Sequence, residues 1–296
     1  MSSPLANNPW IAGARLRTLP AAIVPVAVGT GAAFGEGIAI TAWRAAAAMF
    51  VALALQIATN FANDYSDGVR GTDEGRTGPA RLVGSGAVDA KHVKLAAFAM
   101  FGVAALAGLS LVVAVGPELI LVGIASIAAG WFYTGGSRPY GYAGFGELFV
   151  FVFFGLVATM GSTYVQIEQL TTESFLAAFI VGFFATALLV TNNLRDIPTD
   201  KRSSKNTLAV RLGDLRTRTL YVGLLVAAAV TLGLLSVLRP WAALGFLAFP
   251  LLFTPVTAVR NNAVGAALVP VLVATARAQL VLGIFLTFGL IIGGAK

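Results

Sequence analysis

The chain has 296 residues, of which 57% are hydrophobic and only 11% are charged, whereas soluble proteins carry about 25% charged residues. Long apolar runs recur from end to end, which excludes a soluble domain with one anchor and indicates an integral membrane protein. Cysteine is absent, so disulfides and thiolate chemistry are excluded, and the net charge of +7 is explained by basic membrane loops rather than by nucleic-acid binding.

A helix that crosses a membrane needs about 20 apolar residues, and the sequence contains nine runs of roughly that length. The predicted spans are 19–37, 44–63, 95–115, 118–134, 147–167, 174–193, 219–238, 241–259 and 274–294. Arg277 interrupts the start of the ninth run. We therefore predict one all-α domain, residues 1–296, built as an integral membrane bundle of nine transmembrane helices.

The basic residues are distributed unevenly between the two sides of this predicted bundle. With the N-terminus inside, all but three of the 20 Lys and Arg residues fall in inward-facing segments, the exceptions being Arg44, Arg239 and Lys296. Cytoplasmic loops carry an excess of Lys and Arg. The sequence thus predicts a multi-pass protein of the plasma (inner) membrane with its N-terminus in the cytoplasm.

Two acidic clusters follow apolar runs on this inward side. The first contains Asn63, Asp64 and Asp67, with Asp73 just beyond, and the second contains Asn192, Asp196 and Asp200. Carboxylates at a membrane are expensive unless they bind something. Oxygen clusters of this kind usually bind hard divalent cations.

The spacing within the clusters is helical. Residues three and four apart share a helix face, so Asn60, Asn63, Asp64 and Asp67 form one polar stripe if the second helix extends that far. The Asn-x3-Asp pattern of this stripe recurs 129 residues later at Asn192, where Pro198 is expected to unwind the helix. Two equivalent helix ends are therefore expected to face one cavity.

Basic residues surround both clusters. These are Arg70, Arg76 and Arg81 after the first cluster, and Arg195, Lys201 and Lys205 around the second. Carboxylates interleaved with Lys and Arg suit a metal together with a polyanion, because the bases bind phosphate oxygens directly. The alternative is solvated loops whose Asp and Asn cap helices, but two matched repeats at helix ends argue against it.

Two further features are open to more than one interpretation. The Gly- and Tyr-rich segment from Tyr133 to Tyr142 either closes over a flat ligand or forms a tight turn with interfacial tyrosines. Glu147 begins the next apolar run and is either a proton-handling group or a charge at a helix N-terminus.

Several stretches in a fixed order carry a family resemblance. They are Arg17–Ala22, Ala62–Asp73, Gly78–Val83, Tyr133–Tyr142 and Asn192–Gly213. In these the chain resembles, over essentially its whole length, the UbiA superfamily of intramembrane aromatic prenyltransferases, and most closely its branch acting on 1,4-dihydroxy-2-naphthoate. The resemblance implies a nine-helix bundle whose central cavity opens toward the cytoplasm. Gly71 stands where the family's first motif commonly ends in Asp, and Asp73 is expected to replace it.

The resemblance also implies the reaction and the partners. A polyprenyl chain would pass from polyprenyl diphosphate to 1,4-dihydroxy-2-naphthoate, with decarboxylation, giving demethylmenaquinol and diphosphate. The protein would be surrounded by membrane lipid. The implied Mg²⁺ ligands are Asp64, Asp67, Asp73, Asp196 and Asp200, of which Asp67, Asp196 and Asp200 are the implied catalytic residues. The implied donor-binding residues are Asn63, Arg70, Tyr133, Arg138, Arg195 and Lys205.

Other functions fit the same residues less well. A superfamily member using 4-hydroxybenzoate, homogentisate or haem is the nearest alternative, and the Arg195–Asp200 and Gly78–Arg81 stretches favour the naphthoate branch. The CDP-alcohol phosphotransferase motif is absent beyond Asp67-Gly68. A cation-coupled transporter would place its site near the membrane midplane on broken helices, whereas these clusters lie at helix exits.

Overall fold

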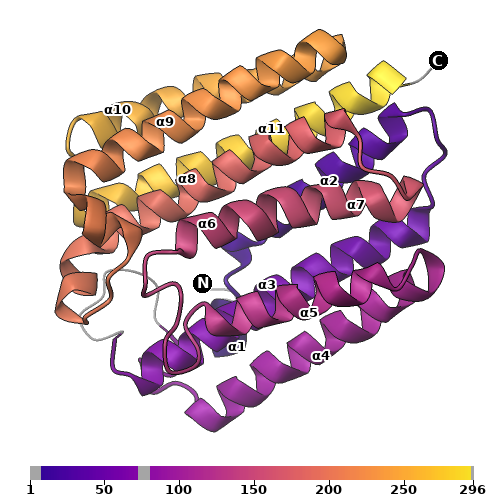
Figure 1. The fold of residues 1–296 in the computed structure, drawn as a ribbon. Helices are drawn as coiled ribbons and strands as arrows, with labels where there is room; N and C mark the ends of the chain where they lie inside the picture. The colour runs from indigo at the N-terminus through magenta and orange to yellow at the C-terminus, as the bar shows by residue number, and fades with distance from the viewer. Residues whose placement is uncertain (1–7, 73–80, 295–296) are drawn as a thin grey trace.

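The computed structural model describes residues 8–72 and 81–294, and within these ranges every regular element is helical (Figure 1). The α-helices are α1 (Pro9–Ala14), α2 (Pro20–Gly35), α3 (Ala42–Val69), α4 (Ala90–Ala114), α5 (Glu118–Phe132), α6 (Gly146–Val150), α7 (Ala158–Ile167), α8 (Thr172–Arg202), α9 (Leu208–Leu238), α10 (Phe253–Arg260) and α11 (Leu268–Gly294). The π-helical segment η3 (Phe151–Val157) joins α6 to α7, and the 3-10 segments are η2 (Leu16–Thr18), η4 (Pro240–Leu252) and η5 (Gly265–Ala267).

The long helices have the length and composition of membrane spans. In the described part of the chain, seven helical segments are long and apolar enough to cross a membrane. The two shorter apolar helices, α2 and α5, coincide with the predicted spans 19–37 and 118–134. The all-helical class and the positions of the apolar runs are confirmed, while the count of nine spans stays a prediction.

Both acidic clusters are part of long helices rather than of loops. Helix α3 runs to Val69, so Asn60, Asn63, Asp64 and Asp67 lie on one continuous helix, as the predicted polar stripe requires. Helix α8, which begins with a capping box formed by Thr171 and Ser174, continues to Arg202. The expectation that Pro198 unwinds this helix is wrong. Leu194 and Ile197 are packed into the core, and this tertiary packing outweighs the one backbone hydrogen bond that proline removes.

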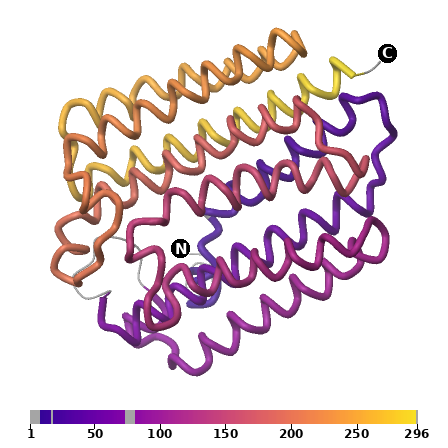
Figure 2. Tube along the Cα trace, viewed as in Figure 1, coloured from indigo at the N-terminus to yellow at the C-terminus, as the bar shows by residue number. Residues whose placement is uncertain are grey.

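The interior consists of two apolar clusters. The larger joins α2, α8, α9, η4 and α11, and Phe184, Leu232 and Leu282 are among its fully buried members. The smaller joins α3 and α4 through residues such as Phe61 and Phe101. Figure 2 shows α3, α4 and α5 as one group of helices, which lies beside a second group that contains α8, α9 and α11. The ends of α3, α5 and α8 and the loops that follow α5 and α8 lie at the same end of the bundle (Figure 1).

Candidate active site

A cavity of about 410 Å³ lies between the two groups of helices. Its walls come from α2, α3, α4, α5, the α6–α7 segment and α8. Along α3 the lining extends from Ala48 to Asp67, which corresponds to roughly 28 Å at 1.5 Å per helical residue. The end near Asp67 is polar and charged, and the remainder is mostly apolar. The cavity can therefore hold a long molecule with one anionic end.

The polar stripe of α3 faces this cavity. Gln56, Asn60, Asn63 and Asp67 all line it, and their spacing of four, three and four residues keeps them on one helix face. Asn63 Oδ1 accepts a hydrogen bond from Thr134 Oγ1 at 2.8 Å. This bond holds the amide of the first motif against the loop that follows α5.

Asp67 is the point where both motifs meet. Its Oδ1 accepts hydrogen bonds from Lys205 Nζ at 3.0 Å and from the Tyr142 hydroxyl, and its Oδ2 lies 4.0 Å from Arg81 Nη2. Lys205 Nζ also sits 4.7 Å from the centre of the Tyr142 ring. Burial, and then the adjacent charge of Asp67, raise the pKa of Tyr142 above its ordinary value, so its hydroxyl keeps the proton that it donates.

Asp64 has different surroundings, although it is only three residues from Asp67. Its side chain is completely buried, and it is not among the described residues that line the cavity. Its Oδ1 accepts hydrogen bonds from Arg15 and Arg81, and its Oδ2 accepts one from the Leu82 backbone at 3.2 Å. Asp64 therefore holds two cavity-lining arginines in place.

The second motif contributes two buried carboxylates to the same polar end. Asp196 and Asp200 both line the cavity. Arg195 binds Asp196 through one edge of its guanidinium group, with Nε and Nη2 each 2.7 Å from a carboxylate oxygen. The carbonyl oxygen of Asp200 accepts a hydrogen bond from the Lys205 backbone at 2.9 Å. This turn directs Lys205 back across the cavity toward α3.

The loop from Tyr133 to Phe145 folds inward over the polar end. Tyr133, Tyr140 and Tyr142 line the cavity, which favours the alternative in which this segment closes over a ligand. The Tyr133 ring packs against Gly141 and Gly146, where any Cβ would lie within 3.2 Å of it. These glycines therefore allow the Tyr133 ring to lie against the backbone at the polar end of the cavity.

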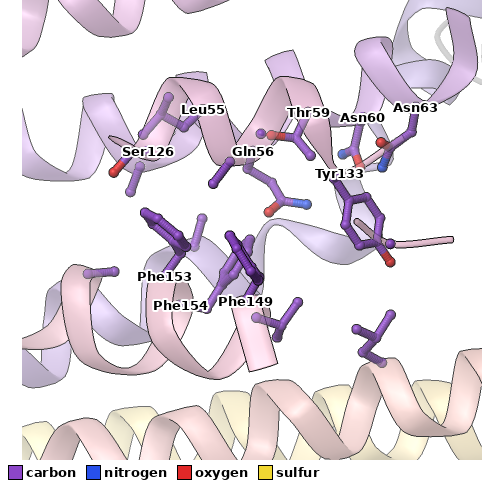
Figure 3. Close-up of a pocket in the computed structure, with 18 of the residues that line it drawn as sticks. Leu55, Gln56, Thr59, Asn60, Asn63, Ser126, Tyr133, Phe149, Phe153 and Phe154 are labelled. Atoms are coloured by element: carbon purple, nitrogen blue, oxygen red, sulfur yellow. The ribbon is translucent and has the colours of Figure 1, made fainter. Parts of the chain in front are cut away.

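An aromatic wall faces the α3 stripe (Figure 3). Phe149, Phe153 and Phe154 lie on the opposite side of the cavity from Gln56 and Thr59. Tyr140 stacks on Phe149 with ring centres 3.9 Å apart, which connects the loop to this wall. A reactive group released at the polar end would therefore meet aromatic faces next.

Glu147 lies directly behind the cavity wall. It is buried, and its Oε1 accepts a hydrogen bond from Asn193 Nδ2 at 2.9 Å. Asn193 itself lines the cavity. Glu147 lies in the first turn of α6, as the alternative of a charge at a helix N-terminus expects, and it orients a cavity side chain. A proton-handling role stays a prediction.

Three predicted donor-binding residues are placed beside the cavity lining rather than in it. Arg70 donates hydrogen bonds to the carbonyl oxygens of Thr134 and Gly136 and so anchors the loop. Arg138 is exposed on that loop, and Arg195 binds Asp196. The predicted ligand Asp73 and the neighbouring Arg76 lie outside the described residues, so their placement stays a prediction.

The donor atoms at the polar end suit a hard cation bound together with phosphate. Among residues 8–72 and 81–294, no three acidic or histidine side chains form a ready-made metal site. Mg²⁺ is typically bound by one or two carboxylates together with water and substrate phosphates. Asp67, Asp196 and Asp200 are buried carboxylates around one cavity. This chemistry fits Mg²⁺ carried with a diphosphate.

Three site residues were missed by the sequence-based prediction. Arg15 was counted only as a topological charge, yet it lines the cavity from a left-handed backbone conformation at φ 52°. Tyr142 belongs to the segment for which the sequence leaves open a ligand cover or a tight turn, and its contact with Asp67 is not predicted. Gln56 continues the α3 stripe one turn inward, and the four-residue step from Asn60 could have identified it.

Comparison with known proteins agrees with this geometry. The profile of the UbiA prenyltransferase family matches residues 22–264. The chain is 52% identical to the 1,4-dihydroxy-2-naphthoate octaprenyltransferase of Mycobacterium tuberculosis over 92% of this chain and 93% of that protein. It is 38% identical to the enzyme of the same name from Escherichia coli over 94% and 95% of the two chains.

Solved structures share the fold. A UbiA homologue from Archaeoglobus fulgidus bound to GPP and Mg²⁺ superposes with a TM-score of 0.69 at 14% identity, covering 96% of this chain and all of that one. The apo structure of a UbiA homologue from Aeropyrum pernix gives the same TM-score and identity over 92% and 97% of the chains. The chain belongs to the UbiA prenyltransferase family and is a multi-pass membrane protein.

Proposed function

We propose that this protein transfers a polyprenyl chain from polyprenyl diphosphate to 1,4-dihydroxy-2-naphthoate, with loss of the carboxyl group as CO₂, to give demethylmenaquinol and diphosphate. The observation that carries the proposal is the contact between Lys205 and Asp67, which joins both acidic motifs at the mouth of a long apolar cavity. The names of the curated relatives support the acceptor. We further propose that residues 1–296 form one domain of nine spans, in the plasma membrane, whose cavity opens toward the cytoplasm.

The polar end of the cavity binds the diphosphate in this proposal. Lys205, Arg15 and Arg81 supply positive charge there, and Asn63 supplies an amide. An ammonium group has three donors, so Lys205 can hold Asp67 and a phosphate oxygen together. Charge-assisted hydrogen bonds of this type are about twice as strong as neutral ones.

Asp67, Asp196 and Asp200 would hold Mg²⁺, which supplies Lewis-acid neutralisation of the leaving diphosphate. Asp64 and Asp73 remain predicted ligands, and the contacts of Asp64 with Arg15 and Arg81 suit a role in orienting those bases. Fixed charges aimed at the leaving group act most strongly where water is excluded. The burial of the three carboxylates meets that condition.

The reaction then needs shelter for a cation. When the donor C–O bond breaks, its electron pair leaves with the diphosphate, and the prenyl group becomes an allylic cation. Phe149, Phe153 and Phe154 present aromatic faces beside the polar end, and such faces attract cations. The electron-rich naphthol ring attacks this cation to form the new C–C bond.

The test is diphosphate release by purified protein in detergent or proteoliposomes. We expect Mg²⁺-dependent release from a polyprenyl diphosphate that is fastest with 1,4-dihydroxy-2-naphthoate in a panel containing 4-hydroxybenzoate and homogentisate. Faster release with another acceptor would overturn the acceptor assignment. No release with any acceptor would overturn the transferase proposal.

A further inference from the structure

Three glycines keep the inner part of the cavity open. Gly108 on α4, Gly123 on α5 and Gly161 on α7 all line the cavity. A Cβ atom built on any of them would meet no other atom within 4 Å. Their lack of a side chain is therefore not required by packing.

Other cavity glycines differ in this respect. A Cβ on Gly130 would come within 2.7 Å of Thr59 Oγ1 and 3.0 Å of Phe101. Gly141 would place a Cβ 2.6 Å from the Tyr133 carbonyl oxygen. These two glycines allow close approach of neighbouring elements, whereas the three open glycines leave cavity space that a ligand can occupy.

The same contacts fix the depth of the open glycines. Because Gly130 abuts Thr59 and Phe101, these residues mark one level of α3, α4 and α5. Gly108 and Gly123 each lie seven residues beyond that level, away from Asp67, which is about 10 Å deeper. Gly161 is deeper still, since Val165, one turn further, accepts a hydrogen bond from Arg44 at 3.0 Å near the start of α3.

Glycine inside a helix lowers stability by about 0.5–1 kcal/mol relative to alanine. Three helices bear that cost in the inner half of one mostly apolar cavity. We propose that Gly108, Gly123 and Gly161 determine the length of the polyprenyl chain that the cavity accepts. This inference rests on the proposed function, because it assigns the distal isoprene units to the inner half of the cavity.

The substitutions Gly108→Leu, Gly123→Leu and Gly161→Leu each add a branched side chain at a position where the Cβ itself meets no neighbour within 4 Å. Leucine is a good helix former, so the helices should be preserved. Rates would be measured with geranyl, geranylgeranyl and octaprenyl diphosphate as donors. We expect kcat/KM for octaprenyl diphosphate to fall by about tenfold or more, as for methylene-scale misfits in apolar pockets, while geranyl transfer stays close to wild type.

Gly102→Leu is the matched control. Gly102 lies on the same helix as Gly108 and also has open space around it, but it does not line the cavity. This variant should keep the wild-type dependence on donor length. Gly→Ala variants at the three cavity positions should lower kcat/KM less than the leucine variants do, again with the largest loss for octaprenyl diphosphate.

The inference is overturned if all three leucine variants keep the wild-type preference among donors, or if they lose activity equally with every donor. Thermal unfolding of each variant in detergent separates an equal loss with every donor from misfolding. If a leucine variant is unfolded, the donor preference of Gly123→Ala is measured in its place. Failure of the proposed function is a different result. In that case the wild-type protein would release diphosphate from none of the three donors.

Discussion

Lys205 and Asp67 are 138 residues apart in the sequence, and their Nζ and Oδ1 atoms are 3.0 Å apart in the fold. Lys205 follows the end of α8, and Asp67 lies on the last turn of α3. Their contact converts two separate acidic motifs into one charged cavity mouth.

Replacing Lys205 with methionine should chiefly weaken donor binding. The substitution removes a charged donor beside the proposed diphosphate, and such hydrogen bonds contribute about 1.5–3 kcal/mol. The KM for polyprenyl diphosphate should therefore rise about tenfold or more, with little change in the KM for the acceptor. Lys201→Met is the control, because Lys201 is exposed on the same helix end. An unchanged donor KM would contradict the assignment.

Asp67→Asn and Asp196→Asn should each nearly abolish turnover. Both carboxylates line the polar end, and losing one such stabilising group costs on the order of 10²–10³ in kcat. Raising the Mg²⁺ concentration should recover part of the rate. Asp89→Asn is the control, because Asp89 caps α4 at an exposed position where asparagine caps equally well. Near-normal activity in either variant would argue against shared metal binding.

Asp64→Asn should lower stability more than Asp67→Asn does. Asp64 is fully buried and accepts hydrogen bonds from both Arg15 and Arg81. Removing one partner of a buried ion pair costs about 3–5 kcal/mol. Thermal unfolding in detergent would measure the difference. Equal midpoints for the two variants would show that Asp64 does not hold the arginines.

Tyr142→Phe should lower kcat about tenfold while leaving the fold intact. The variant removes the hydroxyl that donates a hydrogen bond to Asp67 but keeps the ring beneath Lys205. A hydrogen bond to a charged group contributes about 1.5–3 kcal/mol. Tyr142→Ala should reduce activity further because it also removes the ring.

Tyr164→Phe is the control for Tyr142, since Tyr164 donates to Glu118 at the opposite end of the bundle. The raised pKa of Tyr142 means that its proton stays bound above the ordinary tyrosine range. Wild-type activity should therefore show no alkaline loss from this residue below about pH 10. An alkaline limb below that pH that disappears in Tyr142→Phe would contradict this.

Much of the site is visible in local sequence. The spacing of Asn60, Asn63 and Asp67 predicts one helix face, and that face lines the cavity. The apolar runs likewise predict where the helices lie, because a membrane span must be about 20 apolar residues long. Pro198 shows the limit, since its local helix-breaking tendency is overcome by the packing of its neighbours in α8.

Composition and the spacing of residues along one helix are enough to predict the helical membrane class, the two acidic motifs and the kind of ligand that they suit. Tertiary structure decided which residues share the cavity. Asp64 and Asp67 are chemically identical and three residues apart, but their directions on α3 differ by about 60°. One carboxylate therefore meets Arg15 and Arg81, and the other meets Lys205 across the cavity. Only the packing of α3 against distant segments makes that distinction.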